Sequence, residues 1–285
     1  MLQRTYSTGV EAPVYCRTRI FFDENRSSES PGGYGESIHS RSRTLGWDGV
    51  FNPYLRGEAG LTQKSYDLSR FEDSRTGRVS LWANLNDFAR LGAGFERSDE
   101  LYNRFGFEKG IQSDSIRLEI ESDLTRRWEA GISFRDISYS DDNHGRFLRL
   151  GAGYEFTDHP GIFKAALSAE HRDTRHRSRF IFDAGDNPVD IIHPYWTPQD
   201  YLGVFLTLEW WHDISGPHQY CGNRTHFYDL KATIGTDSES NPGITLEAEW
   251  QHRFSRRWFV GLRGYMHRSR EWDASGAWFS LGCRF

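Results

Sequence analysis

Apolar and polar side chains alternate along almost the whole chain, and this period of two limits the fold more than any other feature of the sequence. Between positions 128 and 135, Trp128, Ala130 and Ile132 fall on one face of an extended strand, while Glu129 and Ser133 fall on the other. No stretch shows a convincing helical period, so the pattern predicts an all-β protein. About fourteen segments carry the alternation, at 13–23, 37–48, 53–65, 76–86, 88–98, 114–123, 127–140, 145–156, 162–173, 201–213, 226–238, 243–254, 257–269 and 275–285.

The C-terminal segment, residues 277–285, keeps this alternation up to the final residue. Phe279 and Leu281 fall on one face with the terminal Phe285, whereas Ser280 and Arg284 fall on the other. A last strand with one apolar and one polar face is typical of a transmembrane β-barrel, where one face meets lipid and the other meets water. The alternative is a soluble β-sandwich whose final strand has the same pattern.

The composition favours the barrel. Aromatic residues make up 15% of the chain and there are 28 glycines, yet the mean hydropathy is only -0.70. No window approaches the roughly 20 apolar residues of a membrane helix, whereas a barrel strand needs apolar residues on only half of its positions. We therefore predict a closed, antiparallel, up-and-down transmembrane β-barrel of about 14 strands, with 16 as the alternative. It would form one domain over residues 1–285 in the bacterial outer membrane.

The lengths of the connections suggest how such a barrel is oriented. The links at 86–87, 124–127 and 157–161 are short and alternate with long ones at 66–75, 99–113 and 174–200. Short turns on the periplasmic side and long loops outside are the rule in outer-membrane barrels. The links 215–225 and 140–144 fit this scheme less well.

The N-terminus carries no visible export signal, because residues 1–6 lack an apolar core segment. An outer-membrane barrel has to be exported, so we expect this chain to be the C-terminal part of a longer protein. A net charge of -5 gives no indication of nucleic-acid binding.

The polar positions carry acidic and basic residues in nearly equal number, together with Trp and Tyr. Any single one of them is explained most simply by an ion pair that braces the barrel wall. Taken together, they predict a wet lumen in which aromatic rings stack on sugars and charged groups bond to hydroxyls, weakly enough for a polymer to slide. The predicted lumen contacts are Arg90, Glu119, Glu129, Arg135, Arg149, Glu155, Glu170, Glu209, Trp211, Asp213, Glu247, Glu249, Arg253, Arg263 and Tyr265.

Two runs of residues resemble a known family of porins. The run from Phe134 to His144, FRDISYSDDNH, resembles the hairpins of exopolysaccharide-export porins, and so does the run from His193 to Tyr201, HPYWTPQDY. The resemblance implies the C-terminal barrel of a tetratricopeptide-repeat protein, of the type that exports poly-N-acetylglucosamine or bacterial cellulose. No helical repeat is present in this chain.

The implied function is a pore for a secreted exopolysaccharide, with no catalysis, metal or cofactor. The implied partners are the polysaccharide chain, outer-membrane lipid and lipopolysaccharide, the barrel-assembly machinery and, for a longer protein, a periplasmic tetratricopeptide scaffold. A general diffusion porin is the main alternative, and an inward-folded loop at 174–200 would favour it. An outer-membrane enzyme is less well supported: the histidine-rich run 171–178 enters an outer loop, and His212, His218 and His226 match no zinc spacing.

Overall fold

The structure is a computed structural model that describes residues 4–15, 18–29, 38–67, 71–100, 104–185, 187–214, 226–255, 258–270 and 273–283. The chain divides into two compact units. The first comprises Met1–Glu121, Ile132–Leu148 and Arg172–Asp200, and the second comprises Ser122–Gly131, Arg149–His171 and Tyr201–Phe285.

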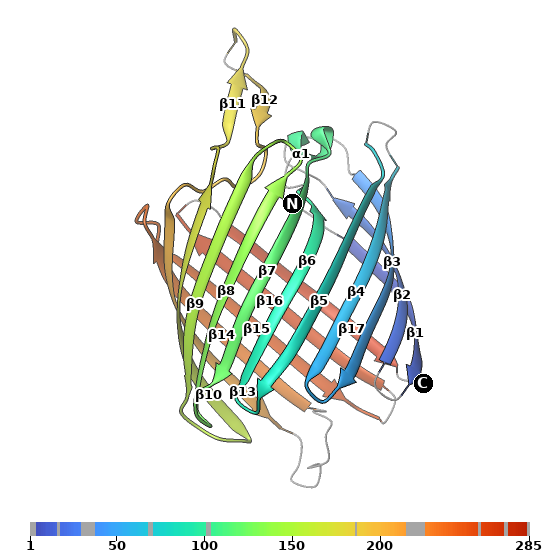
Figure 1. Ribbon diagram of the computed structural model, residues 1–285, viewed down its shortest axis with the longest axis vertical. Helices are drawn as coiled ribbons and strands as arrows, with labels where there is room; N and C mark the ends of the chain where they lie inside the picture. The colour runs from blue at the N-terminus through green and yellow to red at the C-terminus, as the bar shows by residue number, and fades with distance from the viewer. Residues whose placement is uncertain are drawn as a thin grey trace. The chain divides into compact units, whose positions relative to one another are not determined.

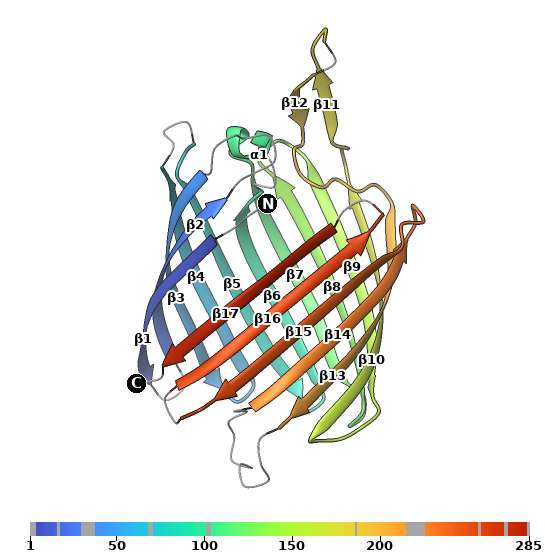
Figure 2. The ribbon, with the colours of Figure 1, turned by 180° about the vertical axis from the view of Figure 1, so that it is seen from behind.

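Within the described residues, fifteen strands form one sheet whose strand order follows the chain order, and two more strands form a separate hairpin. Every pair of neighbouring strands whose register is determined runs antiparallel, and Figures 1 and 2 show successive strands side by side. The sheet strands are β1 (Arg4–Tyr15), β2 (Thr18–Glu29), β3 (Ile38–Asn52), β4 (Leu55–Tyr66), β5 (Ser74–Asn86), β6 (Ala89–Asp99), β7 (Gln112–Asp123), β8 (Trp128–Tyr139), β9 (His144–Glu155), β10 (Gly161–Thr174), β13 (Tyr201–Asp213), β14 (His226–Asp237), β15 (Gly243–Arg253), β16 (Trp258–Ser269) and β17 (Asp273–Cys283). The hairpin consists of β11 (Arg179–Phe182) and β12 (Pro188–Ile192).

Three features differ from the prediction. The segment 13–23 is not one strand, because β1 ends at Tyr15 and β2 begins at Thr18. Val14 and Ile20 both stand at even positions, so the sequence shows no change of phase between the two strands. The hairpin β11–β12 and the helix α1 (Arg104–Lys109) were also missed, since each is too short to show a period. The terminal Phe285 and the link 215–225 lie outside the described residues.

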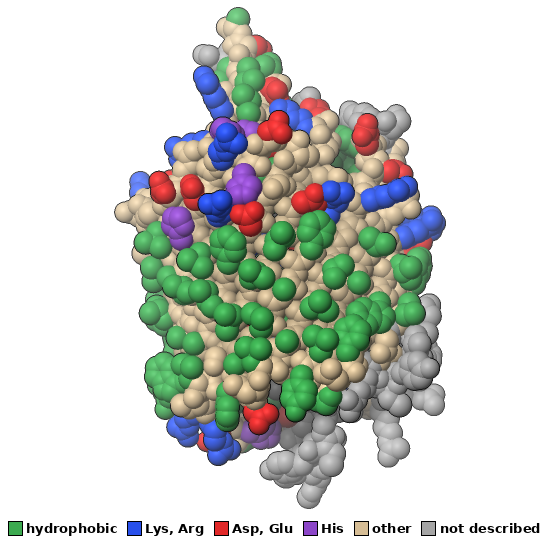
Figure 3. Space-filling model, in the orientation of Figure 1, with side chains coloured by type: hydrophobic (Ala, Val, Ile, Leu, Met, Phe, Trp, Pro, Cys, Tyr) green, Lys and Arg blue, Asp and Glu red, His purple; other side chains and the backbone are tan. Residues whose placement is uncertain are grey.

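The apolar side chains lie on the exposed face of the sheet. On β5, Val79 is 50% and Leu81 is 46% exposed, whereas Ser80 between them is only 6% exposed. Figure 3 shows hydrophobic side chains across the middle of this face, with most charged groups toward the strand ends. A soluble protein buries such residues, and a membrane barrel presents them to lipid. Other large apolar residues of this exposed face are Leu45, Leu61, Phe95, Ile116, Leu118, Ile120, Leu206, Leu208, Leu230, Ile234, Leu262 and Met266.

The buried clusters of the first unit lie where the long connections meet the strand ends. Phe107 of α1 is buried with Ile38 and Phe71, and Tyr66 packs against them. Lys109 at the end of α1 lies 2.9 Å from an Asp190 carboxylate oxygen at the base of the hairpin. The connections at this end of the unit are therefore packed against one another. Among the described residues, no helix is long and apolar enough to cross a membrane.

Candidate functional site: the charged face of the sheet

All fifteen predicted contact residues occupy the strand positions that alternate with the exposed apolar ones. Glu119, for example, lies between Leu118 and Ile120, whose side chains are exposed on the opposite face. We call this second surface the charged face. The strands place Arg90 on β6, Glu119 on β7, Glu129 and Arg135 on β8, Arg149 and Glu155 on β9, Glu170 on β10, Glu209, Trp211 and Asp213 on β13, Glu247, Glu249 and Arg253 on β15, and Arg263 and Tyr265 on β16.

Several of these residues form ion pairs with neighbours on the charged face. Arg90 pairs with Glu121, and an Arg263 nitrogen lies 3.3 Å from a Glu247 carboxylate oxygen. An Arg135 nitrogen reaches a Glu96 oxygen at 3.3 Å. Exposed pairs of this kind contribute only about 0–1 kcal/mol each. These ion pairs neutralise the surface locally. They agree with the interpretation that a single charged residue braces the wall through an ion pair.

One contact spans two strand spacings and depends on a glycine. The Trp82 Nε1–H donates to Glu119 Oε1 at 2.9 Å, although β6 lies between their strands in the sheet. Gly92 of β6 pairs with Trp82, and a Cβ atom at Gly92 would come within 2.5 Å of Glu119 Cγ. The missing side chain therefore lets Glu119 lie flat over the sheet.

The second unit repeats this arrangement on other strands. Lys164 Nζ of β10 lies 2.5 Å from Glu129 Oε1 of β8. This ion pair crosses over Gly153 of β9, where a Cβ atom would lie 2.9 Å from Lys164 Cε. Long charged side chains thus run along the charged face instead of standing upright on it.

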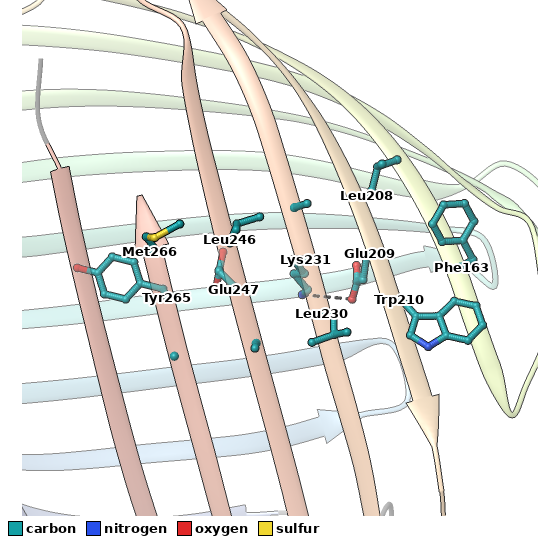
Figure 4. Close-up of a pocket in the computed structure, with 13 residues that line it drawn as sticks. Phe163, Leu208, Glu209, Trp210, Leu230, Lys231, Leu246, Glu247, Tyr265 and Met266 are labelled. Carbon is teal, nitrogen blue, oxygen red and sulfur yellow. Dashed lines mark ion pairs between the residues drawn. The ribbon is translucent and has the colours of Figure 1, made fainter. Parts of the chain in front are cut away.

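Acidic residues gather around one lysine in the second unit. Lys231 Nζ lies 3.2 Å from a Glu209 oxygen and 3.2 Å from an Asp229 oxygen, and Figure 4 shows Lys231 directed toward Glu209. In the register of β14 and β15, Glu247 lies opposite Lys231, and Glu249 lies opposite Asp229. The structure thus brings Glu209, Glu247 and Glu249 together. It adds Asp229 and Lys231, which the alternation places on the same face.

The aromatic residues of the charged face differ in their accessibility. The rings of Tyr265 and Trp278 stack with centroids 5.5 Å apart, and Trp278 is exposed. Trp211, by contrast, is only 9% exposed and contacts Phe227, with ring centroids 6.2 Å apart. A covered ring offers little surface for stacking, which argues against Trp211 as a sugar contact.

The two runs that carry the family resemblance meet at one end of the first unit. Asp141, from the first run, accepts a hydrogen bond from the Tyr195 hydroxyl at 2.8 Å. Its other oxygen lies 2.8 Å from His193 Nδ1. The Tyr195 ring also stacks on Tyr139, with centroids 4.2 Å apart. Both runs could be recognised in the sequence, but the contact between them could not be predicted from it.

The Tyr195 hydroxyl gives this contact a pH dependence. Burial, followed by the hydrogen bond to Asp141, raises the pKa of Tyr195 above its usual value of about 10. An undocked tyrosine loses its proton as the pH rises past about 10, whereas the docked one keeps it, so docking is fully stable below that pH and weakens above it. We expect hydrogen exchange in residues 193–198 to show this loss between about pH 9 and 11.

The variant Tyr195→Phe is the control, because it keeps the ring and has no hydroxyl to titrate. Its exchange profile, corrected for the intrinsic effect of pH, should be flat over the same range. An equal loss of protection in this variant would assign the effect to another group.

Among the described residues, no group of three or more His, Cys, Asp or Glu side chains could hold a metal ion. His226 instead contacts His252, and His212 contacts the Tyr228 hydroxyl, while His218 lies outside the described residues. In the histidine-rich run 171–178, His176 stacks on His193 with ring centroids 5.7 Å apart. That histidine therefore packs the loop.

Comparison with known proteins supports the fold. No protein-family model matches the chain, and no curated protein does. Among solved structures, the chain is similar to a "Bacterial polysaccharide outer membrane secretin", with a TM-score of 0.75 at 16% identity, over 99% of this chain and 91% of that one. It also matches an anion-selective porin from Comamonas acidovorans, with a TM-score of 0.45 at 8% identity over 99% of this chain and 96% of the porin.

A third match is OccK5 (OpdH) from Pseudomonas aeruginosa, with a TM-score of 0.46 at 11% identity, over 99% of this chain and 93% of that one. These last two matches are too distant to carry an argument. The likeness to the secretin shows the fold: an all-β, antiparallel protein of the outer-membrane barrel type. The predicted all-β, antiparallel, up-and-down fold class is thereby confirmed, with fifteen strands in the described sheet instead of about fourteen. The predicted location in the bacterial outer membrane agrees with this fold.

Proposed function

We propose that the chain forms an outer-membrane pore through which a secreted polysaccharide leaves the cell, without catalysis. The observation that carries this proposal is the charged face, where acids, bases and aromatic rings recur from strand to strand and many charges are paired. Such a surface offers many weak contacts spread over several strands, as the passage of a polymer requires. The fold, which is similar to that of a polysaccharide secretin, supports the same proposal.

The long connection 174–200 bears on the alternative of a small-solute porin. That alternative would be favoured by a loop folded inward along its length. Instead, all four residues of β11 are exposed, and Figures 1 and 2 show the hairpin pointing away from the strands of its unit. This supports polymer export over small-solute diffusion. The type of polysaccharide, the contacts with lipopolysaccharide and the assembly machinery, and a periplasmic tetratricopeptide scaffold stay predictions.

A flux measurement tests the proposal. The folded chain would be reconstituted into sealed vesicles, and we would follow the release of linear N-acetylglucosamine or cellulose oligomers and of a branched dextran of equal mass. We expect the linear oligomers to pass and the dextran to be retained, because a polymer threads end-on. Passage of both, or of neither, would contradict polymer export.

Two neighbouring residues of β17 provide a matched pair for this assay. Trp278 belongs to the charged face and Phe279 to the apolar face, and both are exposed. Below saturation, flux scales with the strength of binding, so Trp278→Ala should slow the oligomers about two- to tenfold, the value of one stacking contact. Phe279→Ala should leave flux unchanged. Equal effects of both substitutions on flux would show that transport does not depend on the charged face.

A further inference from the structure

Trp196 is an exposed residue in a segment that is otherwise packed away. It is 50% exposed, while its neighbours Tyr195 and Thr197 are buried, as is Pro194. Because its neighbours are covered, the segment presents the indole of Trp196 alone at its surface.

Hydrogen bonds fix the backbone on both sides of this ring. On one side, the Tyr195 hydroxyl donates to Asp141. On the other, Thr197 Oγ1 accepts from the Ser178 N–H at 2.5 Å, and the Pro198 carbonyl accepts from the Thr174 N–H at 2.8 Å. Trp196 is therefore presented by an ordered segment, which reduces the entropy lost when a ligand binds.

A guanidinium group supports the Trp196 ring and connects it to the charged face. Arg172 Cζ lies 4.7 Å from the Trp196 ring centroid and 5.1 Å from that of Phe147, so the cation contacts two aromatic rings. Arg172 alternates with the apolar residues of β10 and shares the charged face with Glu170, one of the predicted contacts. Trp196 thus lies at the end of this face where the long connections are.

We propose that Trp196 and Arg172 form a carbohydrate site that binds one pyranose ring of the exported polymer. This inference rests on the proposed function. The apolar C–H face of a pyranose fits against an indole ring, and the guanidinium donates hydrogen bonds to sugar hydroxyl or amide oxygens. A neutral or weakly charged sugar suits this pair better than a compact anion. The reason is that the indole can offer an anion only one hydrogen bond, from its single N–H.

The test is calorimetric titration of the folded chain with an N-acetylglucosamine hexamer. We expect Trp196→Ala to weaken binding about three- to tenfold, and Trp196→Phe, which keeps an aromatic face, to weaken it about twofold or less. Phe180→Ala is the matched control, because Phe180 is equally exposed on the same connection but lies on the hairpin β11, away from Arg172. It should bind as tightly as the unchanged chain.

The outcomes separate this inference from the proposed function. Tight binding by the unchanged chain and an equal affinity of Trp196→Ala would overturn the site and leave polymer export intact. Oligomer flux without measurable binding would also overturn the site alone. Absence of both binding and flux would overturn the export proposal, and the site with it.

Discussion

Replacing Leu206 by arginine is expected to destabilise the folded chain in a membrane by about 2–4 kcal/mol. Leu206 lies near the middle of β13 and is exposed on the apolar face, where an arginine would have to be placed in the hydrocarbon layer. The adjacent Thr207 faces the other way and bonds to Thr233, with their hydroxyl oxygens 2.9 Å apart. Thr207→Arg should therefore cost only about 1 kcal/mol, the value of that hydrogen bond.

The two variants would be compared by urea unfolding of the chain folded into lipid vesicles. Gel migration of unboiled against boiled samples reports the folded fraction. The comparison tests which face meets lipid, because the two positions differ by one residue in sequence and by orientation in space. A larger cost for Thr207→Arg than for Leu206→Arg would invert the assignment of the faces.

Replacing Asp141 by alanine is expected to release the segment 193–198 from the strands beneath it. Asp141 accepts from the Tyr195 hydroxyl and contacts His193 Nδ1, so its loss leaves two poorly exposed polar groups without their acceptor. Each such group costs about 1–3 kcal/mol, and together they destabilise docking by about 2–6 kcal/mol. The sheet itself should stay folded.

Asp142→Asn is the matched control for this release. Asp142 is exposed and has a φ of 65°, a conformation that asparagine adopts with little strain. Limited proteolysis within residues 174–200 would report docking, with unboiled gel migration as the check on the sheet. Cleavage should become much faster in Asp141→Ala and stay unchanged in Asp142→Asn. Equal cleavage of both variants would show that Asp141 does not hold the segment.

The strand phase could be predicted because lipid on one face and charge on the other impose a local rule on every second residue. Glu119 and Leu118 reveal their faces without any knowledge of their neighbours. The break between β1 and β2 could not be predicted, because Val14 before it and Ile20 after it both stand at even positions. A connection that keeps the phase of the alternation cannot be detected from a period of two.

Contacts that depend on register or on long loops could not be predicted in the same way. The bridge from Trp82 to Glu119 requires that Gly92 lie between them, and the sequence alone does not align three strands. Likewise, the runs containing Asp141 and Tyr195 are separated by about 50 positions. The exposure of Trp196 follows from that contact, so it became visible only with the structure.

Single-channel conductance of the refolded chain in a planar bilayer shows directly whether the chain is a pore for a polysaccharide. We expect a stable open pore whose current is interrupted by poly-N-acetylglucosamine or cellulose oligomers and is unaffected by amino acids. A chain that is folded by gel migration but conducts no current would contradict it. So would an open pore that these oligomers never interrupt.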